Sequence, residues 1–174
     1  MKNVFILIFG IFSLIPSTTT LQEPVSSVVN VSVPRGAVKL NHSEMVANLQ
    51  KMSKVSELKS VKSKNLFKVN DALLAFWDLE VTEGNAKSLP AIKSEVLELY
   101  KLDQNIVVKE SKIIKMNDQN FLILKYRNGD SNYIRFISDY RKNRAFTGVL
   151  QFEDAKMAEA DYTLNSLIKS VRFK

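Results

Sequence analysis

The sequence contains no cysteine and a single histidine, His42, and it has only five glycines and four prolines in 174 residues. Without cysteine the chain cannot form a disulfide, a thiolate nucleophile, an iron–sulfur cluster or a zinc site built on sulfur. A bacterial lipoprotein is excluded as well, because its lipid is attached to a cysteine at the cleavage point. One histidine supplies neither a multi-histidine metal site nor the base of an identifiable catalytic triad. We therefore expect His42 to be a surface residue, and we expect no metal and no cofactor.

Familiar catalytic motifs are also missing. The chain has no glycine-rich phosphate loop, no Gly-x-Ser-x-Gly sequence and no His-Glu-x-x-His sequence. Its composition, 45% hydrophobic and 25% charged, is that of an ordinary globular protein. The formal net charge of +7 comes mostly from dispersed lysines and favours contact with anionic surfaces. We expect a protein without a catalytic centre and without a nucleic-acid partner.

The first twenty residues have the three regions of a secretory signal peptide. Lys2 precedes an apolar run from Val4 to Phe12, and small polar residues follow from Ser17 onward. The apolar run is shorter than the roughly 20 residues that a membrane span needs. We predict a signal peptide at 1–20, a short N-terminal arm at 21–28 and one globular domain at 29–174. The mature protein is then exported, periplasmic or extracellular, with no stable membrane span, and a bacterial source fits a thiol-free exported domain.

Short motifs predict the elements of the first hundred residues. Asn41 is a good helix N-cap, and the apolar residues that follow it at 45, 49 and 52 share one helical face. Ser88 followed by Leu-Pro is typical of a helix start with proline in the first turn. The expected elements are a strand at 29–34, a helix from 41 that ends or bends in the lysine-rich stretch at 59–64, a strand at 72–81, and a helix from 88 to about 103. The lysine-rich stretch could bind an anion, but we expect a solvated loop whose lysine stems lie on the surface.

The segment from Ile106 to Phe152 predicts an antiparallel meander of four strands. Its turns are marked by residues 117–120, by Asn128-Gly129 and by residues 141–144. Asn-Gly between alternating runs is a strong hairpin signal, because both residues tolerate positive φ. Placing both residues at the tip pairs Arg127 with Asp130, and residues directly opposite each other share a face of the sheet.

Both faces of this meander are expected to be apolar and therefore covered, mostly by helices. One face should hold Ile114, Met116, Phe121, Ile123, Ile134, Phe136 and Val149. The other should hold Ile113, Leu122, Leu124, Tyr126, Tyr133, Ile137, Phe146, Leu150 and Phe152. The predicted fold class is α+β, with a central antiparallel sheet covered on both faces by helices in a three-layer α/β/α arrangement.

Arg135 is unusual in this sheet, because it is predicted on the second face between Leu122 and Leu150. An unpaired buried guanidinium would cost several kcal/mol, on the order of other buried charges. It should therefore meet a carboxylate, reach solvent, or line a cleft that receives an anionic group. Arg141, Lys142 and Arg144 form a basic hairpin tip. We take these four residues as candidate contacts with a partner or ligand.

The C-terminal residues carry a family resemblance. Asp154 can cap a closing helix, and the helix is followed by Leu167-Ile-Lys-Ser-Val-Arg-Phe173 and a short last strand. This ending, with Ala155 before it and the order of elements, resembles the PsbP-like family. Members include a photosystem extrinsic subunit of plants, a Ran-binding nuclear import factor and many small exported bacterial proteins. The resemblance implies the fold and a non-enzymatic accessory role, with no shared catalytic residues.

Three functions remain open. The first is an exported accessory or binding protein that recognises an envelope or extracellular protein, or a small ligand. The second is a small secreted hydrolase that uses carboxylates alone, for which Asp78 and Glu80 on one strand face are the candidates. The third is a protein that binds an anionic polymer or membrane surface through its lysines.

Overall fold

The computed structural model describes residues 26–52, 58 and 65–174. The predicted signal peptide at 1–20, most of the arm at 21–28 and the lysine-rich stretch at 59–64 lie outside these residues. The helices are α1 (His42–Met52), α2 (Leu89–Leu102) and α3 (Met157–Ser170), with a short 3-10 helix, η2 (Asp154–Lys156), before α3. The strands are β1 (Val29–Asn30), β2 (Val38–Lys39), β3 (Asn65–Val69), β4 (Ala72–Glu80), β5 (Ile106–Met116), β6 (Gln119–Asn128), β7 (Ser131–Ser138), β8 (Arg144–Phe152) and β9 (Arg172–Phe173).

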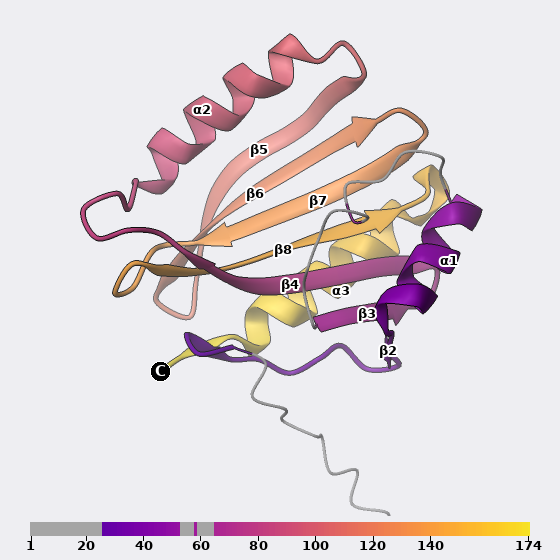
Figure 1. The fold of residues 1–174 in the computed structure, drawn as a ribbon, viewed down its shortest axis with the longest axis horizontal. Helices are drawn as coiled ribbons and strands as arrows, with labels where there is room; N and C mark the ends of the chain where they lie inside the picture. Colours follow the sequence, from indigo (N-terminus) through magenta and orange to yellow (C-terminus); the bar gives the residue numbers. More distant parts are fainter. Residues whose placement is uncertain (1–25, 53–57, 59–64) are drawn as a thin grey trace, which may run out of the picture.

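Seven of these strands form one antiparallel sheet in the order β2-β3-β4-β8-β7-β6-β5 (Figure 1). The predicted four-strand meander is therefore confirmed as β5 to β8, and β4 extends it by pairing with β8. The combination of helices with an antiparallel sheet confirms the predicted α+β class. Strands β2 and β3 were not predicted from the sequence. The signal for β3 was Asn70-Asp71, which turns the chain between β3 and β4 with Asn70 at φ 53°.

The two predicted helix starts are confirmed by their capping bonds. The Asn41 side chain accepts from the Glu44 backbone N–H (2.9 Å), and the Glu44 carboxylate accepts from the Asn41 N–H (2.8 Å). Ser88 accepts from the backbone N–H of Ala91 at 3.4 Å. The expected cap of the closing helix is wrong, because the Asp154 carboxylate accepts from Asn132 at 2.8 Å instead.

Buried hydrophobic clusters lie on both faces of the sheet. One cluster includes residues of α3 and the N-terminal segment, and Figure 1 shows α3 behind the sheet. The other includes Met45 and Leu49 of α1 and Leu89 of α2. Strands β6, β7 and β8 are almost wholly buried at their centres, so both faces are covered there as predicted, whereas the edge strand β5 is largely exposed.

The predicted register is wrong for β8, and this changes which residues share a face. Arg141 and Arg144 pair at the hairpin tip, but Ile137 pairs with Thr147, so β7 has one extra residue between these pairs. In this bulge the Ser138 hydroxyl accepts from the Phe146 backbone N–H at 2.9 Å. A one-residue shift exchanges the two faces of a strand. Phe146, Leu150 and Phe152 accordingly join the cluster with α3, and Val149 joins the cluster with α1 and α2.

The first and last strands close the fold at one end. The expected strand at 29–34 is reduced to Val29–Asn30, which pairs with Arg172–Phe173 in a separate two-stranded sheet. Ser170 holds Ser32 in place, because its hydroxyl accepts from the Ser32 backbone N–H (3.0 Å) while donating to the Leu167 carbonyl oxygen (2.7 Å). Val28, which we had placed in the arm, is buried against the α3 cluster. The N-terminal segment thus runs beside the C-terminus.

Candidate functional site

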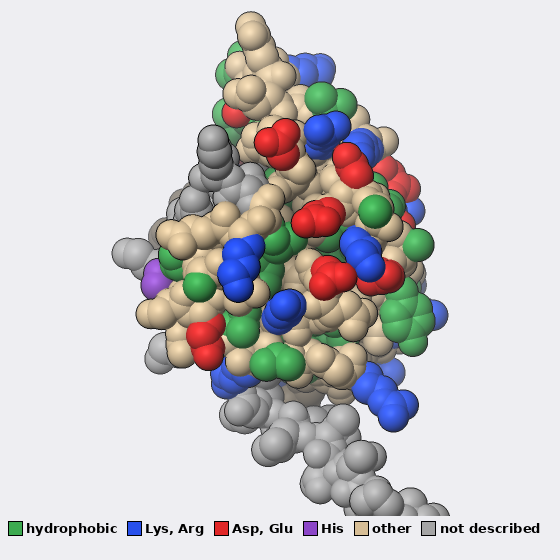
Figure 2. All heavy atoms as spheres, turned by 90° about the vertical axis from the view of Figure 1, so that its right-hand side faces the viewer, with side chains coloured by type: hydrophobic (Ala, Val, Ile, Leu, Met, Phe, Trp, Pro, Cys, Tyr) green, Lys and Arg blue, Asp and Glu red, His purple; other side chains and the backbone are tan. Residues whose placement is uncertain are grey.

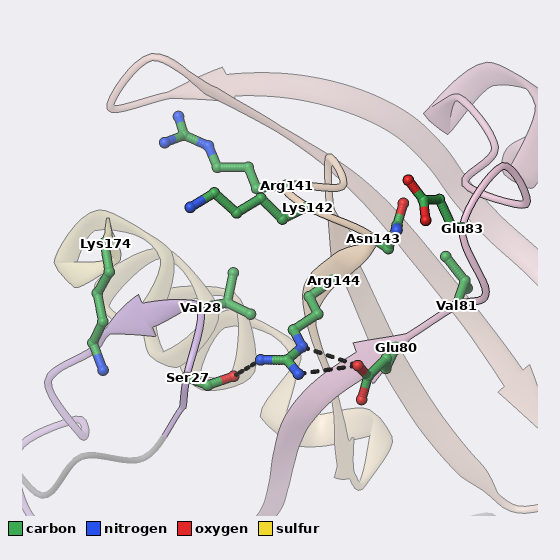
Figure 3. Close-up of a pocket in the computed structure, with 10 residues that line it drawn as sticks. All are labelled: Ser27, Val28, Glu80, Val81, Glu83, Arg141, Lys142, Asn143, Arg144 and Lys174. Atoms are coloured by element: carbon green, nitrogen blue, oxygen red, sulfur yellow. Dashed lines mark hydrogen bonds and ion pairs between the residues drawn. The ribbon is translucent and has the colours of Figure 1, made fainter.

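A cleft of about 930 Å³ lies where β4 ends and β8 begins, beside the paired chain ends (Figure 3). Ten residues line it, of which four are basic and two are acidic. They are Ser27, Val28, Glu80, Val81, Glu83, Arg141, Lys142, Asn143, Arg144 and Lys174. Three of the four basic residues predicted as partner contacts therefore line one hollow.

A tight turn between β7 and β8 positions these basic side chains. Arg141 and Arg144 exchange two backbone hydrogen bonds, of 2.7 and 3.0 Å, around Lys142 and Asn143. Both central residues have positive φ, 47° for Lys142 and 63° for Asn143, as a type I′ turn requires. Asparagine tolerates this conformation, whereas a lysine there costs about 1 kcal/mol relative to glycine. The turn thus holds a lysine at a position that favours glycine.

Arg144 joins the wall of the cleft to the N-terminal segment. It faces Glu80 across β4 and β8, and its Nε and one terminal nitrogen donate to the same Glu80 oxygen at 3.2 and 3.0 Å. Its other terminal nitrogen donates to the Ser27 hydroxyl at 3.2 Å, and Figure 3 shows these bonds. Arg144 is therefore engaged within the chain and shapes the cleft.

Arg141 and Lys174 are also held in place. The Arg141 Nε donates to the Gln119 side chain at 3.0 Å, and its guanidinium carbon lies 4.6 Å from the centre of the Phe173 ring. The Lys174 ammonium donates to the Ser26 carbonyl at 2.7 Å. Arg141 nevertheless is exposed and, among the described residues, forms no ion pair with a carboxylate. Its positive charge therefore remains available to a partner.

Lys142 is the least engaged cation of the cleft. Its side chain is exposed at the tip of the turn, and no hydrogen bond or ion pair joins it to the described part of the chain. Figure 3 shows its ammonium group extending beside Arg141. Together the two side chains present two positive charges on one rim. Such a rim can bind carboxylate groups by charge-assisted hydrogen bonds.

Arg135 does not belong to this cleft. It lies in the middle of β7 with Leu124 of β6 on one side and Val149 of β8 on the other, not between Leu122 and Leu150 as predicted. The β6–β7 prediction fails by two residues because Asn128 pairs with Ser131, which places Gly129 and Asp130 at the turn. A two-residue shift keeps the face, so Arg135 still lies on the face that carries the α1 and α2 cluster.

The two carboxylates considered for a hydrolase have structural partners. Asp78 accepts from the Ser26 hydroxyl and from the Ser27 backbone N–H (2.7 Å) and hydroxyl (2.8 Å). Glu80 is exposed and paired with Arg144. Asp78 therefore anchors the N-terminal segment to β4, and Glu80 is held by Arg144 of β8, an arrangement that does not favour acid–base chemistry at a bound sugar.

Other kinds of site are not found in the described residues. They contain no group of three or more His, Asp or Glu side chains that could hold a metal ion. None of the helices in the described part of the chain has the length and hydropathy to cross a bilayer.

Charges elsewhere on the molecule are mixed. The end opposite the cleft carries Lys109 paired with Asp154 (3.3 Å) and Lys156 paired with Asp71 (3.3 Å). Figure 2, which views this side of the molecule, shows acidic and basic side chains interspersed. The surplus of lysines therefore does not form a single basic face on this side.

Six of the lining residues were not predicted as site residues, although Val81 and Asn143 lie in a predicted strand and a predicted turn. Ser27, Val28 and Lys174 reach the cleft because β1 pairs with β9, a pairing that the two predicted strands did not reveal. Glu83 lies in the loop after β4. A hairpin tip can be read from local sequence, whereas a pairing of chain ends cannot.

Comparison with known proteins supports the fold. No protein-family model matches the chain, and no curated protein matches it. The solved structure of cyanobacterial PsbP (CyanoP) from Synechocystis is similar, with a TM-score of 0.52 and 11% identity over 84% of this chain and 86% of that one. A Pseudomonas aeruginosa protein of unknown function has a TM-score of 0.44 and 10% identity over 64% of this chain and 74% of that one. The likeness to CyanoP supports the PsbP-like fold expected from the closing helix and strand.

Proposed function

We propose that this chain is an exported, non-enzymatic accessory protein of the PsbP-like family that binds an acidic protein partner through the basic cleft. The observation that carries the proposal is the exposed pair Arg141 and Lys142 on the rim of a 930 Å³ hollow. The backbone of Lys142 supports it further, because a lysine is held there at a position that favours glycine.

The cleft is suited to bind an acidic, polar segment of a partner protein. Its floor contains the Arg144–Glu80 pair, which is already neutralised, and its rim holds the two cations without carboxylate partners. An extended peptide carrying Asp or Glu could therefore place carboxylates on the rim while leaving the structural pair intact. The proposal also includes the three-layer α/β/α arrangement and the single domain at 29–174, for which the clusters on both sheet faces are the support.

The alternatives have weaker support. A carboxylate-only hydrolase would use Asp78 or Glu80, but Asp78 holds the N-terminal segment and Glu80 is paired with Arg144. Binding to an anionic surface would need a broad basic face, whereas several described lysines are paired with carboxylates. The accessory role therefore remains the function that the site favours.

Export is tested separately from binding. The full chain, produced in a bacterial host, should be recovered from the periplasm with a new N-terminus near Leu21. Recovery of the chain in the cytosol with the first twenty residues intact would contradict export without affecting the cleft.

Binding is tested by capture of partners from an envelope extract with the exported protein. The variant Arg141→Glu/Lys142→Glu should lose specific prey that the wild type retains. The matched control is Lys68→Glu/Lys101→Glu, which changes the charge equally at two exposed lysines of β3 and α2. Equal prey for all three proteins would reject the cleft as the binding site.

A further inference from the structure

A tight turn directly after β4 places an acidic side chain at the basic cleft. The Asn85 backbone N–H donates to the Thr82 carbonyl oxygen at 3.0 Å, which closes a four-residue turn with Glu83 and Gly84 at its centre. Gly84 has a φ of 82°, the conformation that the third residue of a type II turn requires and that glycine adopts without strain. The turn therefore fixes the position of Glu83, whose exposed side chain lines the cleft.

This turn lies beside the basic turn between β7 and β8. The Val81 backbone N–H donates to the Asn143 carbonyl oxygen at 2.9 Å, so one hydrogen bond joins the segments that carry the two turns. Figure 3 shows the Glu83 carboxylate beside Asn143. The side chains of Arg141 and Lys142 extend in the opposite direction in the same view. The cleft thus has an acidic side and a basic side.

The charges on these two sides are not neutralised within the described part of the chain. Glu83 forms no hydrogen bond or ion pair there, and neither Arg141 nor Lys142 has a carboxylate partner. Glu80 and Arg144, which also line the cleft, bind each other at 3.0 Å. The cleft therefore offers a partner two positive charges on one side and one negative charge on the other.

A segment with acidic residues alone matches only the basic side of the cleft. Where it passes Asn143, a further carboxylate would approach Glu83, and like charges brought together in an interface oppose binding. A segment that also carries a Lys or Arg would meet the opposite charge on both sides. Charge-assisted hydrogen bonds could then form with both sets of side chains.

We propose that Glu83 determines which segment the cleft binds: an extended stretch of an acidic partner protein that carries Asp or Glu residues together with one Lys or Arg. Arg141 and Lys142 bind the carboxylates, and Glu83 binds the ammonium or guanidinium group of the same stretch. This inference rests on the proposed function, because it refines what the same cleft recognises.

The first test selects peptides from a displayed library of random sequences on the exported protein. Peptides enriched on the wild type, relative to Arg141→Glu/Lys142→Glu, should combine acidic residues with a Lys or Arg. The same selection on Glu83→Lys should give acidic peptides without the basic residue. Acidic peptides without a basic residue on the wild type would overturn the role of Glu83 and leave the proposed function standing. No enrichment over the cleft variant would overturn both.

The second test measures the affinity of one enriched peptide by fluorescence anisotropy. Glu83→Gln should weaken its binding by about twofold to fivefold, the size of one exposed charge pair, whereas Glu83→Asp should largely retain it. Glu98→Gln is the matched control, because Glu98 is an exposed residue of α2 outside the cleft, and it should bind like the wild type. Tighter binding by Glu83→Gln would overturn the inference, because it would show that Glu83 only repels the peptide.

A double-mutant cycle then identifies the group that Glu83 contacts. The peptide in which Gln replaces the Lys or Arg should bind the wild type and Glu83→Gln equally, since the proposed charge pair is already lost. An equal loss with both peptides would show that Glu83 acts through the shape of the cleft and not through the basic residue. Unfolding midpoints of the Glu83 variants should match the wild type within a few degrees, because the side chain is exposed.

Discussion

Gly148 of β8 lies directly beside the ring of Phe136 of β7, so closely that a Cβ on the glycine would be 2.5 Å from the Phe136 Cζ. The same Cβ would be 2.6 Å from the Ala75 carbonyl oxygen of β4. Rings from both neighbouring strands occupy the space above this glycine, since Phe76 and Phe136 both pair with it. The absence of a side chain at this position therefore allows the aromatic packing on the α3 side of the sheet.

Gly148→Ala should destabilise the protein by about 2 kcal/mol or more, because the methyl group overpacks a buried site between backbone and ring. Gly129→Ala is the matched control. It meets no atom within 4 Å, and only its positive φ of 58° makes alanine unfavourable, at a cost of about 1 kcal/mol. Denaturant unfolding of the two variants measures the difference. A smaller loss for Gly148→Ala than for Gly129→Ala would contradict the packing.

Lys125 joins α3 to the sheet. Its ammonium group lies 2.7 Å from Asp161 and 2.9 Å from Glu110, and its side chain is only 16% exposed. Lys125→Met should therefore destabilise the protein by about 1–3 kcal/mol, because two carboxylates lose their partner. Lys115→Met is the control, since Lys115 pairs with Asp118 where both side chains are exposed, and it should change stability by less than about 1 kcal/mol. Equal losses in chemical unfolding would show that the Lys125 network contributes no more than a surface pair.

The same network makes stability depend on pH at both extremes. Hydrogen bonds from Lys112 and Lys125 lower the pKa of Glu110 below 4.5, so its contribution is present above pH 4.5 and is lost as the pH falls through the lowered pKa. Burial alone would lower the pKa of Lys125, but hydrogen bonds to Asp161 and Glu110 raise it above 10.5. This contribution is present below pH 10.5 and is lost as the pH rises through the raised pKa.

Unfolding free energies measured from pH 2 to 12 should therefore decline below about pH 4.5 and above about pH 10.5. Lys125→Met should flatten the decline at high pH and reduce the decline at low pH. If the variant has the same pH profile as the wild type, the network does not couple these groups.

Lys142→Gly should increase the stability of the protein and weaken binding at the cleft. Glycine adopts the φ of 47° without the penalty that a lysine incurs, so the variant should be more stable by about 1 kcal/mol. It also removes the least engaged cation of the rim, so capture of an acidic partner should weaken. Thermal unfolding and capture are measured on the same preparation. A variant that is more stable and captures the partner as well as the wild type would show that the lysine has no binding role.

Local signals predicted much of this fold. The caps at Asn41 and Ser88 and the order of the meander strands depend on residues close together in the chain, and these elements were found as expected, although the β6–β7 turn lies one residue later than predicted. The β8 register could not be predicted, because the bulge at Ser138 arises from a hydrogen bond made only after β7 and β8 have paired. That single residue decided which side of the sheet receives Phe146 and Val149.

Only the part of the candidate site that depends on local sequence could be predicted. The basic tip at Arg141 and Lys142 is a local feature, whereas the hollow beneath it depends on β1 pairing with β9, two strands that lie far apart in the sequence. The lack of a carboxylate beside Arg135 likewise depends on which strands flank it. The residue types predicted where basic side chains would lie. The residues that surround them are set by strand pairing between segments far apart in the sequence.

The most direct test of the basic cleft is the comparison of captured partners between the wild type, Arg141→Glu/Lys142→Glu and Lys68→Glu/Lys101→Glu. All three proteins should first show unfolding midpoints within a few degrees of each other, since the changed side chains are exposed and the cleft variant loses in addition only the Arg141 contacts with Gln119 and Phe173. We predict an acidic partner that is retained by the wild type and the control pair and is absent with the cleft variant. The same partner recovered in equal amount by all three proteins would contradict the proposed binding function.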